Sequence, residues 1–342
     1  MDRIALYAAV AAAVMTCQGA RADEAASTAY EFLNVTTSAH VYGLGGHNLT
    51  IIDDDVTLIE QNPALLGPEH DMRASVGYMR YLGSSNYMSA CFAKKVGEHG
   101  AWAVRAQYFG YGSITEASSD GTITGTFNPS DLALCGSFSY DITDNLRGGI
   151  TLKLVQSSYA SYSAFALCTD LGLNYYNPET DNSFSLVAKN LGGQIKKFSD
   201  QYDSMPWDIQ LGWSKLLKSV PVRISVTATN LTKWALPYMD REDSNSTTSE
   251  LVEKSSFASN LFRHLTLAAE LLPSDKFYIG IGYDYKTRTD MTTYARNFIS
   301  GFSITAGLST KSLGFSVAVA QPHIGGTTFM VNITASISDM LK

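Results

Sequence analysis

The chain has 342 residues, a formal net charge of −7, 45% hydrophobic and 11% aromatic residues, and a mean hydropathy of −0.03. The acidic balance and the absence of a basic stripe exclude nucleic acid as an expected partner. The mean hydropathy is typical of a soluble protein, but a transmembrane β-barrel gives the same value because only alternate residues of its strands face lipid.

Residues 1–22 have the features of a secretory signal peptide. A positive residue precedes an apolar, Ala-rich run from Ile4 to Met15, and a small-x-small cleavage site ends at Ala22. The run is shorter than the roughly 20 residues of a membrane-spanning helix. A lipoprotein anchored at Cys17 is the alternative, but Thr precedes this Cys where a small residue is expected.

Residues 23–73 lack the alternating pattern of the rest of the chain. They include the glycine cluster at 43–46 and the acidic triplet at 53–55. Neither has the spacing of a dinucleotide site or of an EF-hand, so no cofactor and no metal is predicted. A segment this short has too small a core to fold alone. We expect it to fold into the mouth of a barrel as a hatch.

Residues 74–342 form about fourteen short segments of alternating polarity, joined by connections that alternate between short and long. Residues 97–100 and 273–276 are short turns, whereas 112–130 and 230–263 are long and polar. Outer-membrane barrels have tight periplasmic turns and long outer loops. A β-sandwich would also alternate in polarity, but fourteen strands with this loop asymmetry would be unusual for one.

We therefore predict an all-β fold: a transmembrane antiparallel β-barrel of about 14 strands, integral to a bacterial outer membrane, with the hatch in its lumen. Each strand is expected to have about nine to eleven residues, the length that crosses a bilayer at a tilt. This arrangement predicts on which side of the barrel wall each side chain lies, because alternation with a period of two places neighbouring residues on opposite faces of a strand.

Alternation places Ile209 and Ile281 outside the barrel and Gln210 inside it. Ionisable residues of both signs fall on the inward face: Arg105, Lys153, Asp170, Asp208, Arg223, Glu270 and Asp284. We interpret them as a polar network of the lumen made of structural ion pairs, with a polar conduit or ligand site as the alternative. Three cysteines remain after cleavage and are interpreted as buried thiols, although one pair could bridge: Cys91, Cys135 and Cys168.

The long connection at 230–263 carries Trp234 and Tyr238 near its barrel end, followed by a polar stretch. Aromatic residues surrounded by polar ones are common in protein interfaces, so these two are candidate partner-docking residues. Membership of an aromatic girdle at the membrane surface is an equally good interpretation.

No motif of a catalytic site is present, including G-x-S-x-G, H-E-x-x-H and C-x-x-C. The pair His264 and Thr266 has the spacing of the His and Ser in some barrel hydrolases of the outer membrane. Here the pair is predicted to face the lumen, away from lipid substrates. We therefore expect no enzymatic activity and no catalytic residues.

Several motifs resemble the PorQ family of the type IX secretion system. They run nearly the length of the mature chain and include Phe32-Leu33-Asn34, Gln61-Asn62-Pro63-Ala64-Leu65-Leu66, Val187-Ala188-Lys189-Asn190 and Asn230-Leu231-Thr232-Lys233-Trp234. The wider FadL-like group, including the PorV family, shares only the general plan of a hatch and a 14-stranded barrel. The C-terminal residues 340–342 lack the terminal aromatic residue common in outer-membrane barrels.

The resemblance implies a non-enzymatic role in protein secretion. Members of the PorQ family anchor a PorZ-like surface protein within an attachment complex that contains PorU-like and PorV-like proteins. The family has no active site to transfer to this chain. The alternative function is a FadL-like transporter of hydrophobic small molecules. A transporter requires an apolar cavity of ligand size, whereas the inferred lumen is charged.

Overall fold

The computed structural model describes residues 30–118, 121–198, 202–217, 219–241, 251–254, 256–274, 276–291, 299–323 and 326–341. The predicted signal peptide lies outside the described residues, so its cleavage site stays a prediction. Among the described helices, none is long and apolar enough to cross a membrane.

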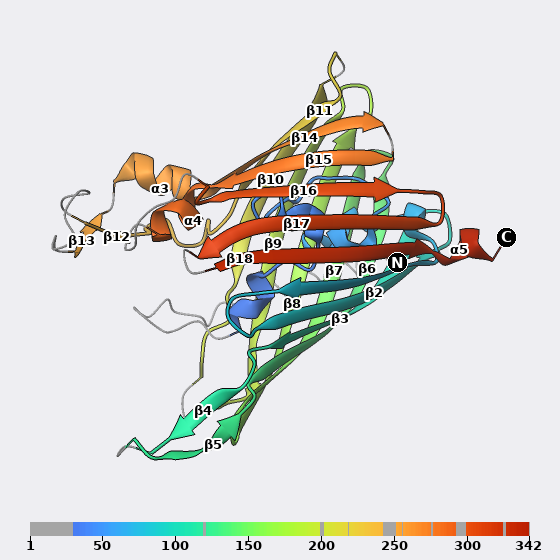
Figure 1. The fold of residues 1–342 in the computed structure, drawn as a ribbon. Helices are drawn as coiled ribbons and strands as arrows, with labels where there is room; N and C mark the ends of the chain where they lie inside the picture. The colour runs from blue at the N-terminus through green and yellow to red at the C-terminus, as the bar shows by residue number, and fades with distance from the viewer. Residues whose placement is uncertain are drawn as a thin grey trace, which may run out of the picture.

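Within the described residues, fourteen antiparallel strands form a closed barrel (Figure 1). In chain order they are β1 (Arg73–Arg80), β2 (Asn86–Val96), β3 (Gly100–Gly110), β6 (Ser130–Thr143), β7 (Leu146–Tyr159), β8 (Tyr162–Asn177), β9 (Asn182–Lys196), β10 (Asp208–Leu217), β11 (Val222–Ala228), β14 (Leu265–Ser274), β15 (Phe277–Asp284), β16 (Phe302–Ser309), β17 (Leu313–His323) and β18 (Gly326–Ser336). Strands that follow one another pair together, and β1 pairs with β18 to close the barrel.

The long connections contain structure that the polarity pattern did not predict. One holds the hairpin of β4 (Ile114–Ala117) and β5 (Ile123–Phe127), and another holds β12 (Tyr238–Arg241), β13 (Leu251–Lys254) and α3 (Phe257–Arg263). With α4 (Tyr285–Asp290), they lie at the end of the barrel opposite α5 (Ile337–Met340) and the C-terminus (Figure 1). We call the end with the long connections the outer end.

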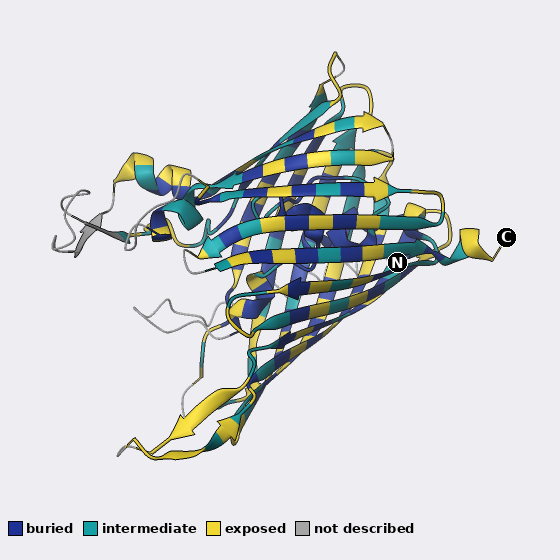
Figure 2. Ribbon diagram, in the orientation of Figure 1, coloured by how far each residue is buried: buried dark blue, intermediate teal, exposed yellow. Residues whose placement is uncertain are grey.

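Exposed and buried residues alternate along the strands, as the bands in Figure 2 show. Ile209 and Ile281 are 39% and 45% exposed on the outside, whereas Gln210 is 4% exposed on the inside. A closed barrel has no free strand edge, and its apolar outer surface suits a bilayer. The predicted fold class is therefore confirmed. The predicted strand length is wrong for β1, β11, β15 and β16, which have 7 or 8 residues, and for β6, β7, β8 and β9, which have 14 to 16.

These four strands are longer because their hydrogen-bonded pairing continues past the usual span at one or both ends. The β7 and β8 ladder, for example, runs without interruption from Leu146 opposite Tyr175 to Tyr159 opposite Tyr162.

Residues 30–72, which we call the hatch segment, lie inside the barrel and contain only short helices: η1 (Glu31–Asn34), α2 (Ala39–Tyr42), η2 (Val56–Glu60), η3 (Pro63–Leu65) and η4 (Pro68–His70). The side chains of Ser38 and Asn62 accept hydrogen bonds from backbone N–H groups at the starts of α2 and η3. These capping bonds stabilise short helices that no hydrophobic periodicity predicts.

Two glycines of the barrel wall allow the hatch backbone to approach closely. A Cβ atom at Gly282 would lie 2.0 Å from the carbonyl carbon of Leu44, and one at Gly149 would lie 2.4 Å from that of Pro63. Any side chain at these positions would displace the hatch segment. The hatch is thus fitted to this wall rather than loosely enclosed by it.

We predict that Ile281→Arg destabilises the barrel by roughly 2–4 kcal/mol, because it places a charge on the lipid face near the middle of the bilayer. The measurement is the fraction of folded protein in heat-modifiability gels after refolding into vesicles. Ile281→Leu is the control and should fold like the unmodified protein. Equal loss in the two variants would contradict the outward facing of Ile281.

Candidate functional site

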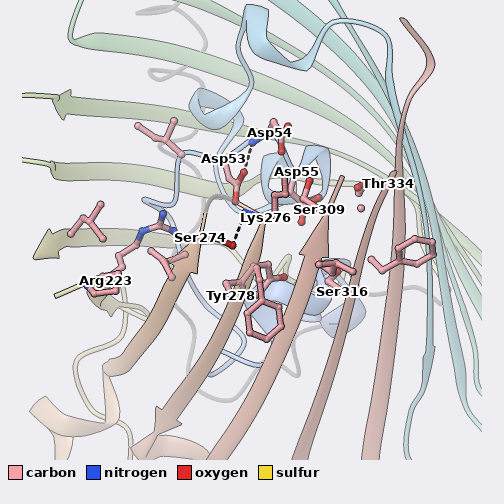
Figure 3. A pocket seen from close by; sticks show the side chains of 18 of the residues that line it. Asp53, Asp54, Asp55, Arg223, Ser274, Lys276, Tyr278, Ser309, Ser316 and Thr334 are labelled. Carbon is pink, nitrogen blue, oxygen red and sulfur yellow. Dashed lines mark hydrogen bonds between the residues drawn. The ribbon is translucent and has the colours of Figure 1, made fainter. Parts of the chain in front are cut away.

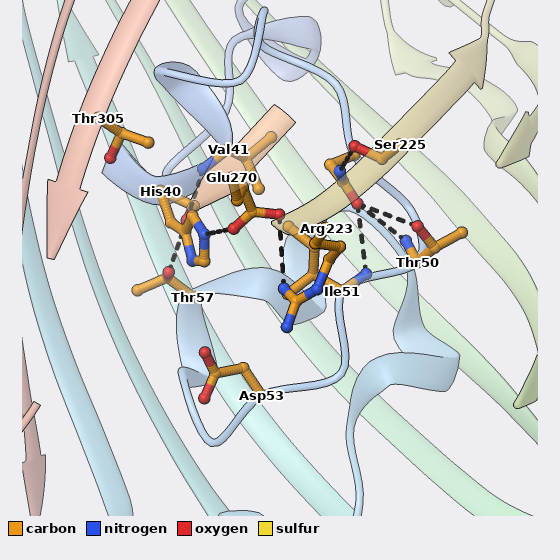
Figure 4. Close-up of polar contacts among 12 residues, drawn as sticks. His40, Val41, Thr50, Ile51, Asp53, Thr57, Arg223, Ser225, Glu270 and Thr305 are labelled. Atoms are coloured by element: carbon orange, nitrogen blue, oxygen red, sulfur yellow. Dashed lines mark hydrogen bonds and ion pairs between the residues drawn. The ribbon is translucent and has the colours of Figure 1, made fainter. Parts of the chain in front are cut away.

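Hatch and wall are joined by a buried ion-pair cluster centred on Glu270 of β14 (Figure 4). His40 of α2 places Nε2 at 2.6 Å from Glu270 Oε1, and Arg223 of β11 places Nη1 at 3.4 Å from Glu270 Oε2. The His40 ring also stacks on Tyr278 of β15, with ring centroids 3.9 Å apart. One hatch side chain therefore contacts two separate strands of the wall.

A second buried carboxylate, Glu60 of η2, lies deeper in the hatch. It accepts hydrogen bonds from Thr36 Oγ1 at 2.9 Å and Gln61 Nε2 at 2.8 Å, and Lys189 Nζ of β9 lies 3.4 Å away. Burial raises the pKa of Glu60, but the charges of Lys189 and Arg105 and the bond from Gln61 outweigh it and bring the pKa to about 2. Glu60 is therefore a carboxylate at any physiological pH.

A third ion pair lies within the wall. Lys153 of β7 and Asp170 of β8 are 2.7 Å apart, and both are almost fully buried. Asn190 of β9 joins them, because its side-chain oxygen accepts from Lys153 Nζ and its backbone N–H donates to Asp170. Asn190 has a positive φ of 56° and lies beside a shift in the β8–β9 register. The pair is thus linked to an irregularity of the wall.

Most of the predicted lumen residues do lie in the lumen. Buried there are Arg105, Lys153, Asp170, Asp208 and Glu270, while the Arg223 side chain is 16% exposed. Asp208 accepts hydrogen bonds from Gln210 Nε2 and the Asn230 N–H, and has no ion-pair partner among the described residues. Whether these residues act as a site rather than as structural ion pairs stays a prediction.

Asp284 lies at the outer end of β15, opposite Thr266, whose side chain is buried on the inward face. Its carboxylate accepts from the backbone N–H groups of Lys286 and Thr287 and so caps α4, because the chain turns here into a helix whose first N–H groups need an acceptor. Its membership of the lumen network stays a prediction.

Sequence reasoning missed His40, Glu60 and Lys189. Lys189 had a usable signal, because it continues the inward alternation of Ser185 and Val187. His40 and Glu60 lie in short turns without periodicity. Their partners are 230 and 129 residues away in the chain, and such contacts leave no local signal.

A cavity of about 550 Å³ opens below the hatch, among the short turns (Figure 3). The hatch residues Asp53, Asp54 and Asp55 line one side, and Lys276 and Tyr278 line the other. The pKa of Asp53 is raised to about 6, mainly by burial. The neighbouring carboxylates of Asp54 and Asp55 raise it further, whereas the charge of His40 lowers it. Apolar side chains, including Leu216, Leu272 and Phe277, line the same cavity, so it combines charged and apolar walls.

The outer end of the lumen is aromatic. Seven rings, which we call the mouth cluster, have neighbouring centroids 4.7–6.3 Å apart: Tyr30, Phe198, Tyr159, Tyr111 and Phe109 in succession, with Tyr81 and Tyr87 both against Phe109. The hydroxyl groups of Tyr111 and Tyr159 donate to Asp131 at 2.6 and 3.0 Å. These bonds fix two half-buried rings at the opening, and the contacts continue inward to the hatch residue Tyr30.

The remaining predicted residues have clear positions. The three cysteines are free and buried, so the predicted buried thiols are confirmed and the bridge is not formed: Cys91, Cys135 and Cys168. Trp234 is 45% exposed near the outer end and stacks on His264, and Tyr238 lies under the guanidinium group of Arg263. His264 and Thr266 are buried, as the predicted inward facing requires.

Comparisons with known proteins support the fold alone. No protein-family model matches the chain, and no curated protein matches its sequence. Among solved structures, a Pseudomonas aeruginosa FadL homologue aligns with a TM-score of 0.52 and 12% identity over 88% of this chain and 98% of its own.

Two further structures align to a similar extent. The Pseudomonas putida toluene transporter TodX has a TM-score of 0.51 and 11% identity, and the CymD monoaromatic hydrocarbon channel has 0.54 and 13%. Each alignment covers 89% of this chain and 98% of the other. The chain therefore has the β-barrel fold of FadL-like proteins, and no comparison supports the finer resemblance to the PorQ family.

We predict that acidification strengthens the attachment of the hatch. The folded-state pKa of Asp53, about 6, lies above its ordinary value of 3.8, so folded protein holds this proton more tightly than unfolded chain. The resulting stability is fully present below the ordinary value and is lost as the pH rises through 6. Protease resistance of the hatch should be higher at about pH 5 than at about pH 7.5. Asp53→Asn should remove this difference, and an undiminished difference in that variant would contradict the assignment.

Proposed function

We propose that this protein is an integral outer-membrane channel that takes up small hydrophobic molecules, and that the mouth cluster is where they first bind. The fold shared with a FadL homologue, a toluene transporter and a monoaromatic hydrocarbon channel supports the proposal. The observation that carries it is the continuous aromatic contact from the outer opening to the hatch.

The mouth cluster has the chemistry to bind a single aromatic ring. Edge-to-face and offset contacts with aromatic side chains are worth about 0.5–1.5 kcal/mol each beyond the area that they bury. Because Asp131 holds the hydroxyl groups of Tyr111 and Tyr159, their ring faces rather than their polar tips are offered to a ligand. Phe198 adds a half-buried ring from the neighbouring connection.

Passage beyond the mouth requires the hatch segment to move. The wall glycines leave no space between hatch and barrel on the sides of Leu44 and Pro63. Below the mouth, His40 and Lys189 are paired with buried carboxylates. In this proposal the ligand binds above a closed hatch, and a shift of the hatch admits it to the lower cavity.

The test is uptake of toluene into vesicles that contain the purified protein. Tyr111→Ala and Phe198→Ala should each slow uptake about fivefold or more, because each removes one aromatic face from the entry site. Tyr108→Ala is the matched control, since Tyr108 is 42% exposed on the outside of the same wall. Uptake no faster than in protein-free vesicles would contradict a channel function, whereas equal uptake in all variants would contradict the mouth cluster as the entry site.

A second candidate function is a docking barrel. One observation favours it: the β4–β5 hairpin and the β12, β13 and α3 region extend outward from a barrel that the hatch closes (Figure 1). In this proposal the barrel anchors a PorZ-like surface protein, with PorU-like and PorV-like proteins in the same complex. Trp234, with its ring 5.5 Å from that of the exposed Phe257, offers an aromatic contact.

For the docking function we predict that Trp234→Ala combined with Tyr238→Ala releases the surface partner into the medium. Loss of a central aromatic anchor typically weakens binding by about 2 kcal/mol or more. The measurement compares the amount of partner bound to cells with the amount in the medium. The amount of the barrel protein itself, which should be unchanged, is the control. Toluene uptake should be unchanged in this variant. Normal retention would exclude this loop as the principal dock.

A further inference from the structure

Helix α3, in the connection 230–263, turns its polar side toward the protein. Its buried residues are Asn260 and Arg263, which are 6% and 3% exposed. The guanidinium group of Arg263 pairs with Asp290 of α4 at 2.7 Å and donates a hydrogen bond to Thr289 of the same helix. Polar contacts, rather than apolar packing, therefore attach α3 to the outer end of the barrel.

The opposite side of α3 is apolar and exposed (Figure 2). Phe257, Leu261 and Phe262 are 71%, 39% and 52% exposed. Residues four and five positions apart fall on one broad face of a helix. A helix on the surface of a soluble domain has the reverse arrangement, with its apolar residues toward the core and its polar residues outward. The arrangement of α3 therefore suits a helix with apolar surroundings outside the protein.

The exposed face of α3 is continuous with the lipid-facing wall of the barrel. Phe262 lines a groove of about 370 Å³ whose other walls are apolar or aromatic: Leu265, Leu267, Tyr283 and Tyr285. Leu267 lies on the outside of β14, and the rings of Phe262 and Tyr285 are 5.9 Å apart. Tyrosine side chains at the ends of barrel strands are typical of the interface between bilayer and water. The groove therefore lies where the outer surface of the bilayer meets the wall.

We propose that α3 lies on the outer surface of the membrane, with Phe257, Leu261 and Phe262 among the acyl chains of the outer leaflet. Helices of this kind bury their apolar face about 5–10 Å into the boundary between headgroups and acyl chains. The continuity with the lipid-facing wall identifies lipid, rather than a protein partner, as the contact of this face. The polar side remains on the barrel, where Arg263 has its partners.

This contact holds the connection 230–263 at the membrane surface, beside the barrel opening. The helix leads into β14, whereas the mouth cluster lies on the hatch and on the strands and connections from β1 to β9. A connection held by lipid at β14 is kept away from the mouth cluster. Trp234, whose ring lies 5.5 Å from that of Phe257, is then placed at membrane level. The inference applies to a channel and to a docking barrel alike.

The experiment measures tryptophan fluorescence of the full chain in phosphatidylcholine vesicles whose acyl chains carry bromine, a quencher. Phenylalanine first replaces the four native tryptophans: Trp102, Trp207, Trp213 and Trp234. In this background, Leu261→Trp should be quenched by the brominated chains to within about twofold of the lipid-facing Leu267→Trp. Acrylamide in the water should quench it weakly. Thr124→Trp, at an exposed position of β5, is the control and should respond to acrylamide but not to the brominated chains.

Two further variants test the apolar face itself, with folding checked by heat modifiability. Phe257→Ser combined with Phe262→Ser should lower the quenching of Leu261→Trp by brominated chains about twofold or more, because it removes most of the face that binds lipid. Ala258→Ser changes a small exposed residue of the same helix and should leave the quenching unchanged. Strong quenching of Leu261→Trp by acrylamide alone would show a face in water, and quenching by neither agent would show a face covered by protein. Either result, or undiminished lipid quenching in the double serine variant, would overturn the proposal.

Discussion

The inward face of every strand must find hydrogen-bond partners in a lumen that is filled by protein. Alternation sends polar side chains inward, and the hatch segment occupies the space where water would otherwise solvate them. The pairs of His40 with Glu270 and of Lys189 with Glu60 meet this demand across the boundary between hatch and wall. Removing one partner of such a pair typically costs about 3–5 kcal/mol, because the other charge stays buried and unpaired.

This constraint separates the lumen into zones of different chemistry. Ion pairs hold the middle of the hatch, a cavity with both charged and apolar walls lies beneath it, and aromatic rings lie above it near the outer opening. A molecule that binds to the aromatic side chains of the mouth cluster finds no such contacts in the ion-paired middle of the lumen. Its passage therefore requires the hatch to move. The mouth is therefore suited to capture, while the middle is suited to closure, and uptake would couple the two.

Local patterns predicted the wall well and the hatch poorly. The period of two placed Ile209, Ile281 and Gln210 on their observed faces, because facing depends only on neighbouring residues. The capping of α4 by Asp284 could not be predicted from the alternation, because it depends on where the strand ends and the helix begins. His40 and Glu60 could not be predicted, since their contacts join parts of the chain more than a hundred residues apart.

The β1–β18 seam has a consequence for biogenesis. This seam joins the first and last strands of the barrel. Inside the barrel, the hatch lies so close to Gly282 and Gly149 that no side chain would fit at either position. Closing this seam and seating the hatch against these glycines are therefore coupled: a wall that is not closed at β1 and β18 does not hold all the surfaces against which the hatch packs.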